Sequence, residues 1–384
     1  MAATRCQYMI YMLMETGTTL DHLLGGITGH LQLKPEQHRD AESWYATLSE
    51  WLALDPEISR YAPEFFPQGS LSLGTTVRPK GRKEFDLDFV VQLRIDFRRV
   101  ARPSQLLELI ERRLRAHPVV GAFVSRENRC VRVRIVGKFH LDVVPACPDV
   151  TSGGNCIVVP DLKAEGWKPS NPRDYRPWFT YRCAILVKAL EAREPLPPQE
   201  EHGEKAPLKL AVQLLKRWRD VSFDDPQLKN LAPASCVLTT VAAASYRGDA
   251  SVASSVAVAI DGLILATSHP VPRPILNPVN AKELLNEQWM EDRTAYEVFG
   301  RKIRMFGEEW AALGKGRGLP QIGLLLGRLF GEDAAEAALG EMSSAMEKAR
   351  RASAVGVVSG SGFLTTAASP VVTPVRSNNF YGAD

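Results

Sequence analysis

The stretch from Gln68 to Leu93, QGSLSLGTTVRPKGRKEFDLDFVVQL, decides the fold. In its second half apolar and acidic residues alternate with the period of two that a β-strand has. Asp86 and Asp88 therefore share one face of a strand. The opposite, apolar face is formed by Phe85, Leu87, Phe89 and Leu93. Two neighbouring carboxylates repel one another and resist burial unless a cation lies between them, so the pair predicts a divalent metal site.

The first half of the same stretch predicts a phosphate-binding loop. Gly69 and Ser70 follow Gln68, and a backbone approaches a phosphate closely only where side chains are small. Residues 69–76 read GSLSLGTT, which lacks the lysine of a Walker-type loop and so argues against that ATPase chemistry. The zincin, α/β-hydrolase and Rossmann motifs are also missing from the sequence.

A third carboxylate is predicted on a neighbouring strand. Cys130–Val136 and Phe139–Pro145 both alternate cleanly, and the Gly137-Lys138 pair between them suits a two-residue hairpin turn. Asp142 then lies opposite an apolar face, with His140, which we interpret as structural, on its own side. An isolated pair of aspartates on a strand is usually an exposed sheet face. Combined with the Gly-Ser loop and Asp142, the pattern favours two-metal nucleotidyl transfer, in which positioning does most of the work.

Composition sets wider limits on the chain. With 384 residues, 45% of them hydrophobic, it has room for one large or two medium domains, and a net charge of +3 does not by itself indicate nucleic-acid binding. The six cysteines show no C-x-x-C spacing, which argues against zinc and fits a reducing cytoplasm. No apolar run approaches the ~18 residues of a membrane span. We interpret apolar residues 6–14 as a packed terminus, or Met14 as the true start, rather than as a secretion signal.

Periodicity divides the chain into an N-terminal extension (1–34), a catalytic lobe (35–200), a helical lobe (201–350) and a flexible tail (351–384). The catalytic lobe should begin with an amphipathic helix over Pro35–Ala53 and contain a second helix capped by Ser104. Residues 146–178 read as loop-rich, and residues 196–207 as the crossover between lobes. Helices are expected over residues 178–194, 208–220, 234–246, 281–305 and 323–350.

These motifs resemble a known family. The order of G-S, a D-x-D strand and a third strand aspartate resembles the nucleotidyltransferase superfamily that includes DNA polymerase beta. More narrowly, the chain resembles the bacterial cyclic GMP-AMP synthase/DncV-like nucleotidyltransferases over roughly residues 35–340. The narrower resemblance is carried by VPDLKAEGWKPSNPRDYRPWF from Val159, PLKLAVQLLKRWRD from Pro207, S-x-x-L-T-T from Ser235 and ILNPVNAKELLNEQW from Ile275.

The resemblance implies an α+β fold, with a polymerase beta-like mixed sheet, a helical C-terminal lobe and an active site in the cleft between them. It implies synthesis of a cyclic di- or trinucleotide signal from ATP and/or GTP, with release of pyrophosphate, in anti-phage defence. By that resemblance two Mg²⁺ ions, replaceable by Mn²⁺, would be held by carboxylates, and the triphosphate by the loop and the helical lobe. The implied residues are Asp86, Asp88 and Asp142 for metal and catalysis, and Gln68, Gly69, Ser70, Lys216 and Ser235 for the nucleotide.

The resemblance also bears on partners and alternatives. The zinc ribbon that animal members use in DNA sensing has no ligands here, so no DNA requirement is expected. The ending NNFYGAD, residues 378–384, resembles tails that a ubiquitin-transfer-like partner conjugates, and an unconjugated flexible tail is the alternative. Two other functions stay open: transfer of single nucleotides to a small molecule, protein or RNA, and a degenerate nucleotide-binding scaffold. The sequence leaves base identity, linkage, ring size and oligomeric state undetermined.

Overall fold

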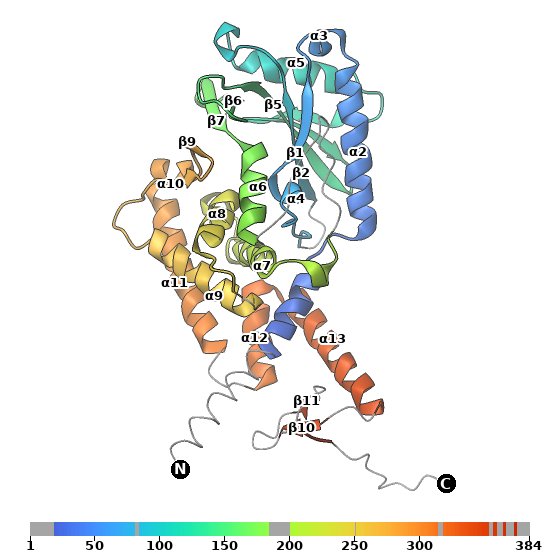
Figure 1. The fold of residues 1–384 in the computed structure, drawn as a ribbon, viewed down its shortest axis with the longest axis vertical. Helices are drawn as coiled ribbons and strands as arrows, with labels where there is room; N and C mark the ends of the chain where they lie inside the picture. The colour runs from blue at the N-terminus through green and yellow to red at the C-terminus, as the bar shows by residue number, and fades with distance from the viewer. Residues whose placement is uncertain are drawn as a thin grey trace.

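The computed structural model describes residues 19–80, 84–183, 200–249, 251–313 and 318–352, together with three short strands near the C-terminus. Figure 1 shows an elongated molecule with a sheet at one end and a bundle of helices at the other. The apolar stretch at residues 6–14, the choice between Met1 and Met14, the expected helix beyond Cys183 and the final residues 375–384 all lie outside the described part.

A seven-stranded mixed sheet forms the first half of the molecule. The strands run in the order β1-β2-β5-β4-β3, and β6 pairs with both β5 and β7. Strands β2 and β5 are parallel, whereas the other neighbours are antiparallel. The strand bounds are β1 Glu64–Gln68, β2 Phe85–Gln92, β3 Val124–Arg126, β4 Val131–Ile135, β5 Phe139–Pro148, β6 Ile157–Asp161 and β7 Gly166–Ser170.

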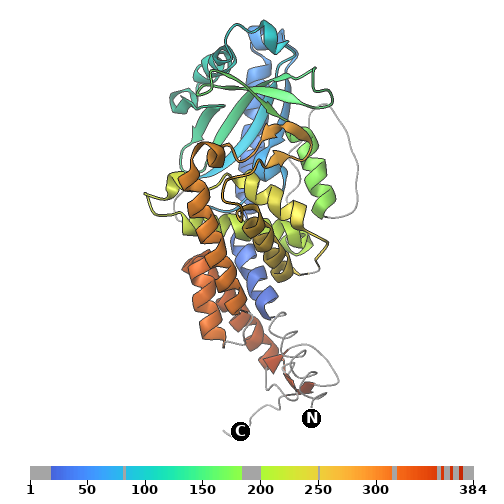
Figure 2. The same ribbon diagram turned by 90° about the vertical axis from the view of Figure 1, so that its left-hand side faces the viewer.

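The two faces of this sheet differ in polarity. Helices α2 (Pro35–Ala53) and α5 (Ser104–Arg115) contribute to one hydrophobic core with the inward residues of β2, β4 and β5, such as Leu87 and Leu141, which are fully buried. Alternation places Asp86, Asp88 and Asp142 on the other face. This confirms the predicted period-two pattern of both strands. Figure 2 shows the helical half packed below the sheet half.

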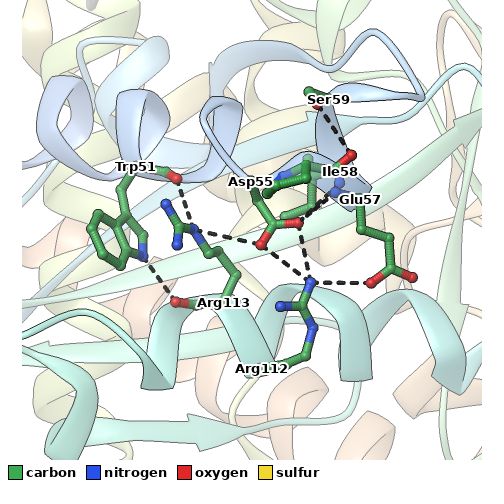
Figure 3. Close-up of polar contacts among 8 residues, drawn as sticks. Trp51, Asp55, Glu57, Ile58, Ser59, Arg112 and Arg113 are labelled. Carbon is green, nitrogen blue, oxygen red and sulfur yellow. Dashed lines mark hydrogen bonds and ion pairs between the residues drawn. The ribbon is translucent and has the colours of Figure 1, made fainter.

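Asp55 joins the helices that cover the apolar face of the sheet (Figure 3). It lies just after α2 and caps the short helix α3 (Pro56–Ser59) by accepting hydrogen bonds from the backbone N–H groups of Glu57 and Ile58. Arg112 of α5 donates to both of its carboxylate oxygens. Hydrogen bonds from Arg112 and from these amides hold the pKa of the buried Asp55 carboxyl below its ordinary value, against the opposing effect of desolvation. This cluster joins α2 to α5 and takes no part in the site.

The second half is helical and contains chain from both ends. Helical residues 19–30 bury Leu20, Leu23, Leu24 and Ile27 in the same core as α7 to α13, and Gly26 lies directly against Ala338 of α13 (Figure 1). Within the described residues, no helix combines the length and apolarity that crossing a bilayer requires. The helix bounds are α6 Pro172–Cys183, α7 Pro207–Ser222, α8 Ser235–Ser245, α9 Val252–Ala266, α10 Glu287–Glu291, α11 Arg293–Leu313, α12 Leu319–Phe330 and α13 Glu332–Arg351.

The two halves are joined by polar contacts around a small hairpin, β8 (Leu276–Asn277) with β9 (Asn280–Leu284). Glu283 of β9 accepts hydrogen bonds from the Ser170 hydroxyl at 3.1 Å and from the Asn171 backbone N–H at 3.1 Å. Close by, Glu287 of α10 accepts from Arg129 and Lys168 of the sheet half, at 2.5 and 2.9 Å. These carboxylates fix the sheet half against the helical half.

Helices expected over Pro35–Ala53 and over residues 208–220 and 234–246 are confirmed, and several other expectations are wrong. Residues 146–178 contain β6, β7 and the start of α6 rather than loop. The prolines of this segment suggested a loop, but β6 still pairs with β5 and β7. The single helix expected over 281–305 is instead β9, α10 and α11. The helix expected over 323–350 is divided into α12 and α13 at Gly331, whose φ of 93° suits glycine. Helix α9 was not predicted.

Two local expectations also need correction. Ser104 is the first residue of α5 rather than its cap, since Pro103 occupies the cap position and provides no side-chain hydrogen bond. The β4–β5 connection has three residues instead of two, because the ladder ends at the Ile135–Phe139 pair; Gly137 adopts a φ of 74° within it. Near the C-terminus, residues within the expected tail form a three-stranded sheet of β10 (Gly356–Val358), β11 (Leu364–Thr365) and β12 (Val372–Pro374).

Candidate active site

Two parallel strands bring the predicted carboxylates together. In the β2–β5 register Asp88 is the partner of Asp142, and Asp86 is the partner of His140. Register partners on adjacent strands point to the same face of a sheet, so the carboxylates of Asp88 and Asp142 lie side by side. Asp142 is buried, with 7% of its surface exposed, while Asp86 lies nearer the solvent at the start of β2.

The predicted phosphate loop packs directly on this carboxylate cluster. Gln68 ends β1 opposite Asp88, and the chain then turns at Gly69, whose φ is 67°. A Cβ atom added to Gly69 would lie only 2.2 Å from the Asp88 Oδ2 atom, closer than carbon and oxygen can approach. Glycine is therefore required here for two reasons: the left-handed backbone and the contact with Asp88. Ser70 follows in the short helix α4 (Gly69–Ser72).

The cluster carries excess negative charge. Burial, together with the charges of Asp142 and Asp86, raises the pKa of Asp88 to about 7. The pKa of Asp86 is also raised, by the loss of hydration and by the Asp142 charge, although Arg132 and His140 oppose the change. Repulsion of this kind is relieved by a bound cation.

Arg132 of β4 is a site residue that sequence reasoning missed. Its Nε and Nη2 atoms both donate to the Asp142 carboxylate, at 2.7 Å each, and Nη2 lies 3.6 Å from Asp86. The signal was available: in CVRVRIV the arginines alternate with valines, and Arg132 is the register partner of Asp142. A guanidinium thus neutralises the third carboxylate in this conformation.

The donor set fits a divalent cation, with one rearrangement. Carboxylate oxygens are the ligands that Mg²⁺ and Mn²⁺ prefer. The raised pKa of Asp88 reflects its burial together with the negative charges of Asp142 and Asp86, which such an ion would compensate. In the described part of the chain, however, no three acidic, histidine or cysteine side chains converge closely enough to hold a metal ion. Arg132 donates to both oxygens of the Asp142 carboxylate. Metal binding by all three aspartates therefore requires Asp142 to exchange its arginine partner.

His140 and Glu84 border the cluster. His140 Nε2 lies 2.7 Å from the Glu84 carboxylate, and Nδ1 lies 3.4 Å from Asp86. The imidazole thus bridges two carboxylates on the rim, and Glu84 is held in turn by Arg134. We regard this as support for the position of Asp86.

The loop after α4 joins Ser70 to the helical half. The Thr76 hydroxyl donates to Ser70 Oγ at 3.2 Å. Lys216 of α7 is buried and donates to the Thr75 carbonyl at 3.2 Å and to the Thr75 hydroxyl at 2.9 Å. Burial and the neighbouring Arg219 lower the pKa of Lys216 to about 7, and the charge of Asp88 acts in the opposite direction. The structure thus brings Lys216 next to the loop rather than to an exposed basic helix face.

Ser235 lies at the first turn of α8. Its hydroxyl accepts a hydrogen bond from Arg219 Nη1 at 2.5 Å, and the same guanidinium donates to Asp220. Arg219 also lowers the pKa of Lys216, so it acts on both of the predicted residues of the helical half. Sequence reasoning gave Arg219 no part in this arrangement.

Comparisons with known proteins identify the family of this chain. Residues 14–182 match the model of the Second Messenger Oligonucleotide or Dinucleotide Synthetase domain. A c-di-GMP synthase of Roseivirga ehrenbergii is 31% identical over 376 residues, which cover 95% of this chain and 98% of that protein. The likeness therefore extends through both halves of the molecule.

Solved structures share the fold. CdnG of Bradyrhizobium diazoefficiens in complex with GTP superimposes with a TM-score of 0.70 at 21% identity, covering 84% of this chain and 98% of that one. The apo form of DncV from Vibrio cholerae gives a TM-score of 0.54 at 16% identity, over 86% and 82% of the two chains. The mixed sheet and helical C-terminal region expected from the sequence are confirmed. The chain belongs to the cyclic GMP-AMP synthase/DncV-like nucleotidyltransferases, the bacterial family of cyclic oligonucleotide synthases that its motifs resemble.

Proposed function

We propose that this chain condenses GTP into a cyclic dinucleotide, with release of pyrophosphate at each step. The observation that carries the proposal is the contact between the phosphate loop and the carboxylate cluster: Gly69 packs on Asp88, which is in register with Asp142. Such a site holds a triphosphate and a hydroxyl against the same pair of carboxylates. The guanine base is proposed because the relative that is similar over nearly the whole chain is a c-di-GMP synthase.

The residues of the loop would bind the donor triphosphate. Ser70 Oγ already accepts a hydrogen bond from Thr76, so its own hydroxyl proton is free to be donated to a phosphate oxygen. Lys216, with a pKa near 7, would take up a proton as the triphosphate arrives, because added negative charge favours the ammonium form. Ser235 would offer a further hydroxyl, held in place by Arg219.

The three aspartates would hold two Mg²⁺ ions, and Mn²⁺ would serve as a substitute. When bound, such ions polarise the α-phosphate and lower the pKa of the attacking hydroxyl. Asp142 would face the acceptor hydroxyl once it leaves its partner Arg132, which donates to both of its carboxylate oxygens. Asp86 and Asp88 project from one strand and so keep a fixed separation.

We further propose the biological setting that the family implies. The product would act as a second messenger in anti-phage defence, and the reaction would take place in the cytoplasm, where nucleoside triphosphates and Mg²⁺ are abundant. Recognition of the C-terminal tail by a ubiquitin-transfer-like partner is a separate proposal and is tested by mass analysis of the tail in cells that carry such a partner.

A product assay tests the proposed reaction. The purified chain is incubated with Mg²⁺ and with labelled ATP, GTP, CTP and UTP, singly and together, and the products are treated with phosphatase before chromatography and mass spectrometry. A phosphatase-resistant dinucleotide formed from GTP without an added acceptor is expected. Linear products, or label transferred only to an added acceptor, would instead favour single-nucleotide transfer.

Asp88→Asn checks the assigned mechanism. It removes a ligand and should lower product formation at least about 1,000-fold while the protein remains folded, because metal-assisted transfer loses a carboxylate that no neighbour replaces. Asp96→Asn is the matched control, since Asp96 lies outside the cluster in an ion pair with Arg98. An Asp88→Asn protein that stays both folded and active would refute the mechanism.

A further inference from the structure

The segment that follows the phosphate loop is held by a row of side chains from the helical half. Backbone carbonyls at residues 74, 75, 76 and 78 each accept a hydrogen bond from α7 or from the residues just before it. The bonds run from Lys205 to Gly74 O (3.1 Å), from Lys216 to Thr75 O (3.2 Å), from Gln213 to Thr76 O (2.7 Å) and from Arg217 to Arg78 O (2.9 Å). The helical half therefore sets the path of this segment residue by residue.

Gln213 is the neutral member of that row and its most deeply buried one. None of its surface is exposed, and it lies in α7 among apolar neighbours such as Val212 and Leu214. Its amide donates to the Thr76 carbonyl and accepts from the Gln32 amide at 3.0 Å. A buried amide is costly unless its hydrogen bonds are made, whereas an apolar side chain would fill the same volume without that requirement. The role of Gln213 must therefore lie in the hydrogen bonds that its amide makes.

Thr76 connects Gln213 to the phosphate loop. Its carbonyl receives the Gln213 amide, while its hydroxyl donates to Ser70 Oγ at 3.2 Å. Thr76 is itself buried, with 8% exposed, and its bond to Gln213 is fully buried, whereas its bond to Ser70 is partly buried. The result is a continuous row of hydrogen bonds from Gln32 through Gln213 and Thr76 to Ser70.

We propose that Gln213 is a positioning residue for nucleotidyl transfer, acting through Thr76 on Ser70. By fixing the Thr76 backbone it fixes the hydroxyl that holds Ser70 Oγ, and so it directs the Ser70 proton toward the donor triphosphate. The inference rests on the function proposed above for Ser70. It also gives the chain that precedes α2 a part in the reaction, because Gln32 holds the far side of the Gln213 amide.

A double-mutant cycle tests this. Gln213→Met fills the volume and removes the amide, and kcat/KM should fall about 10- to 100-fold at temperatures well below melting, since small displacements at a transfer site are costly. In a Ser70→Ala background the same change should cause no further loss of activity, whereas its effect on the melting temperature should persist in both backgrounds. Thr267→Val, which removes a buried hydroxyl at the end of α9, is the control and should leave kcat/KM unchanged.

Thr76 supplies a second test should Gln213→Met fail to fold. Thr76→Ser keeps the hydroxyl and should retain activity. Thr76→Val removes the hydroxyl, and its kcat/KM should fall by about as much as that of Gln213→Met. Equal losses in Thr76→Ser and Thr76→Val, or a Gln213→Met loss that adds in full to Ser70→Ala, would overturn the positioning role. A harmless Ser70→Ala would overturn both this inference and the assigned role of Ser70, and Asp88→Asn then shows separately whether the carboxylate mechanism stands.

Discussion

Two glycines in the predicted phosphate loop allow the effect of steric contact with Asp88 to be separated from the effect of backbone strain. Gly69 and Gly74 have nearly equal φ values, 67° and 68°, so alanine should strain the backbone by a similar amount at either position, about 1–2 kcal/mol. Their surroundings differ. A Cβ at Gly69 would meet Asp88 Oδ2 at 2.2 Å, whereas at Gly74 the nearest atoms lie 3.4 Å away, at the ends of the Glu200 and Lys209 side chains.

The expected size of the effect follows from these distances. To bring the 2.2 Å contact to an acceptable 3.0 Å, the Asp88 carboxylate must move by about 0.8 Å. A displacement near 1 Å at a reacting group typically costs about 100-fold in rate. Gly69→Ala should therefore lose about 100-fold in kcat or more, while Gly74→Ala should stay within about threefold of the parent.

The assay is steady-state product formation from GTP for both variants, with chemical denaturation to confirm that both variants remain folded under the assay conditions. Comparable losses of activity in the two variants would refute the reasoning, because the contact with Asp88 would then have no special weight. A Gly69→Ala protein with full activity would do the same.

Three further predictions follow from other contacts. Between about pH 7 and pH 10 the unfolded chain binds a proton at Lys216 that the folded chain lacks. The free energy of unfolding should therefore rise by up to about 1.4 kcal/mol per pH unit over this range. Urea denaturation of Lys216→Met should show a smaller rise. Arg132→Gln removes a cation that competes for Asp142, so Mn²⁺ should bind the nucleotide-free protein about tenfold more tightly by electron paramagnetic resonance; unchanged or weaker binding would contradict this competition. Glu287→Ala should lower the free energy of unfolding by about 1–2 kcal/mol, because the contacts with Arg129 and Lys168 are lost. Glu297→Ala is the control: its i,i+4 ion pair is exposed, so the free energy of unfolding should fall by less than about 0.5 kcal/mol.

The carboxylate cluster could be predicted because strand periodicity is local. Alternation in FDLDFV assigns each side chain to a face, and the same rule applied to the next hairpin adds Asp142. That the two strands pair in parallel with Asp88 opposite Asp142 depends on the crossover through α5, which no short window of sequence contains.

The missed features share a physical cause. Arg132 and Gln213 act through partners that are distant in the sequence: Arg132 through the pairing of β4 with β5, and Gln213 through the contact of α7 with residues 74–78. The helix expected over residues 281–305 is wrong because β9 gains its hydrogen bonds from β8 and packs on β7, and such contacts override local helical preference. Glycine at 331 was a visible break signal that the apolar periodicity on either side obscured.

The placement of helical residues 19–30 has a consequence for how the protein is made. Their apolar side lies in a core that includes helices near the other end, as the contact between Gly26 and Ala338 shows. At translation rates of roughly 5–20 residues per second, about 300 further residues take roughly 15–60 s to emerge. During that interval the sheet half can already fold on the ribosome, while Leu23, Leu24 and Ile27 await their partners. An amphipathic segment that exposes its apolar side during synthesis is a natural substrate for chaperones. A C-terminal fragment expressed without this segment should aggregate.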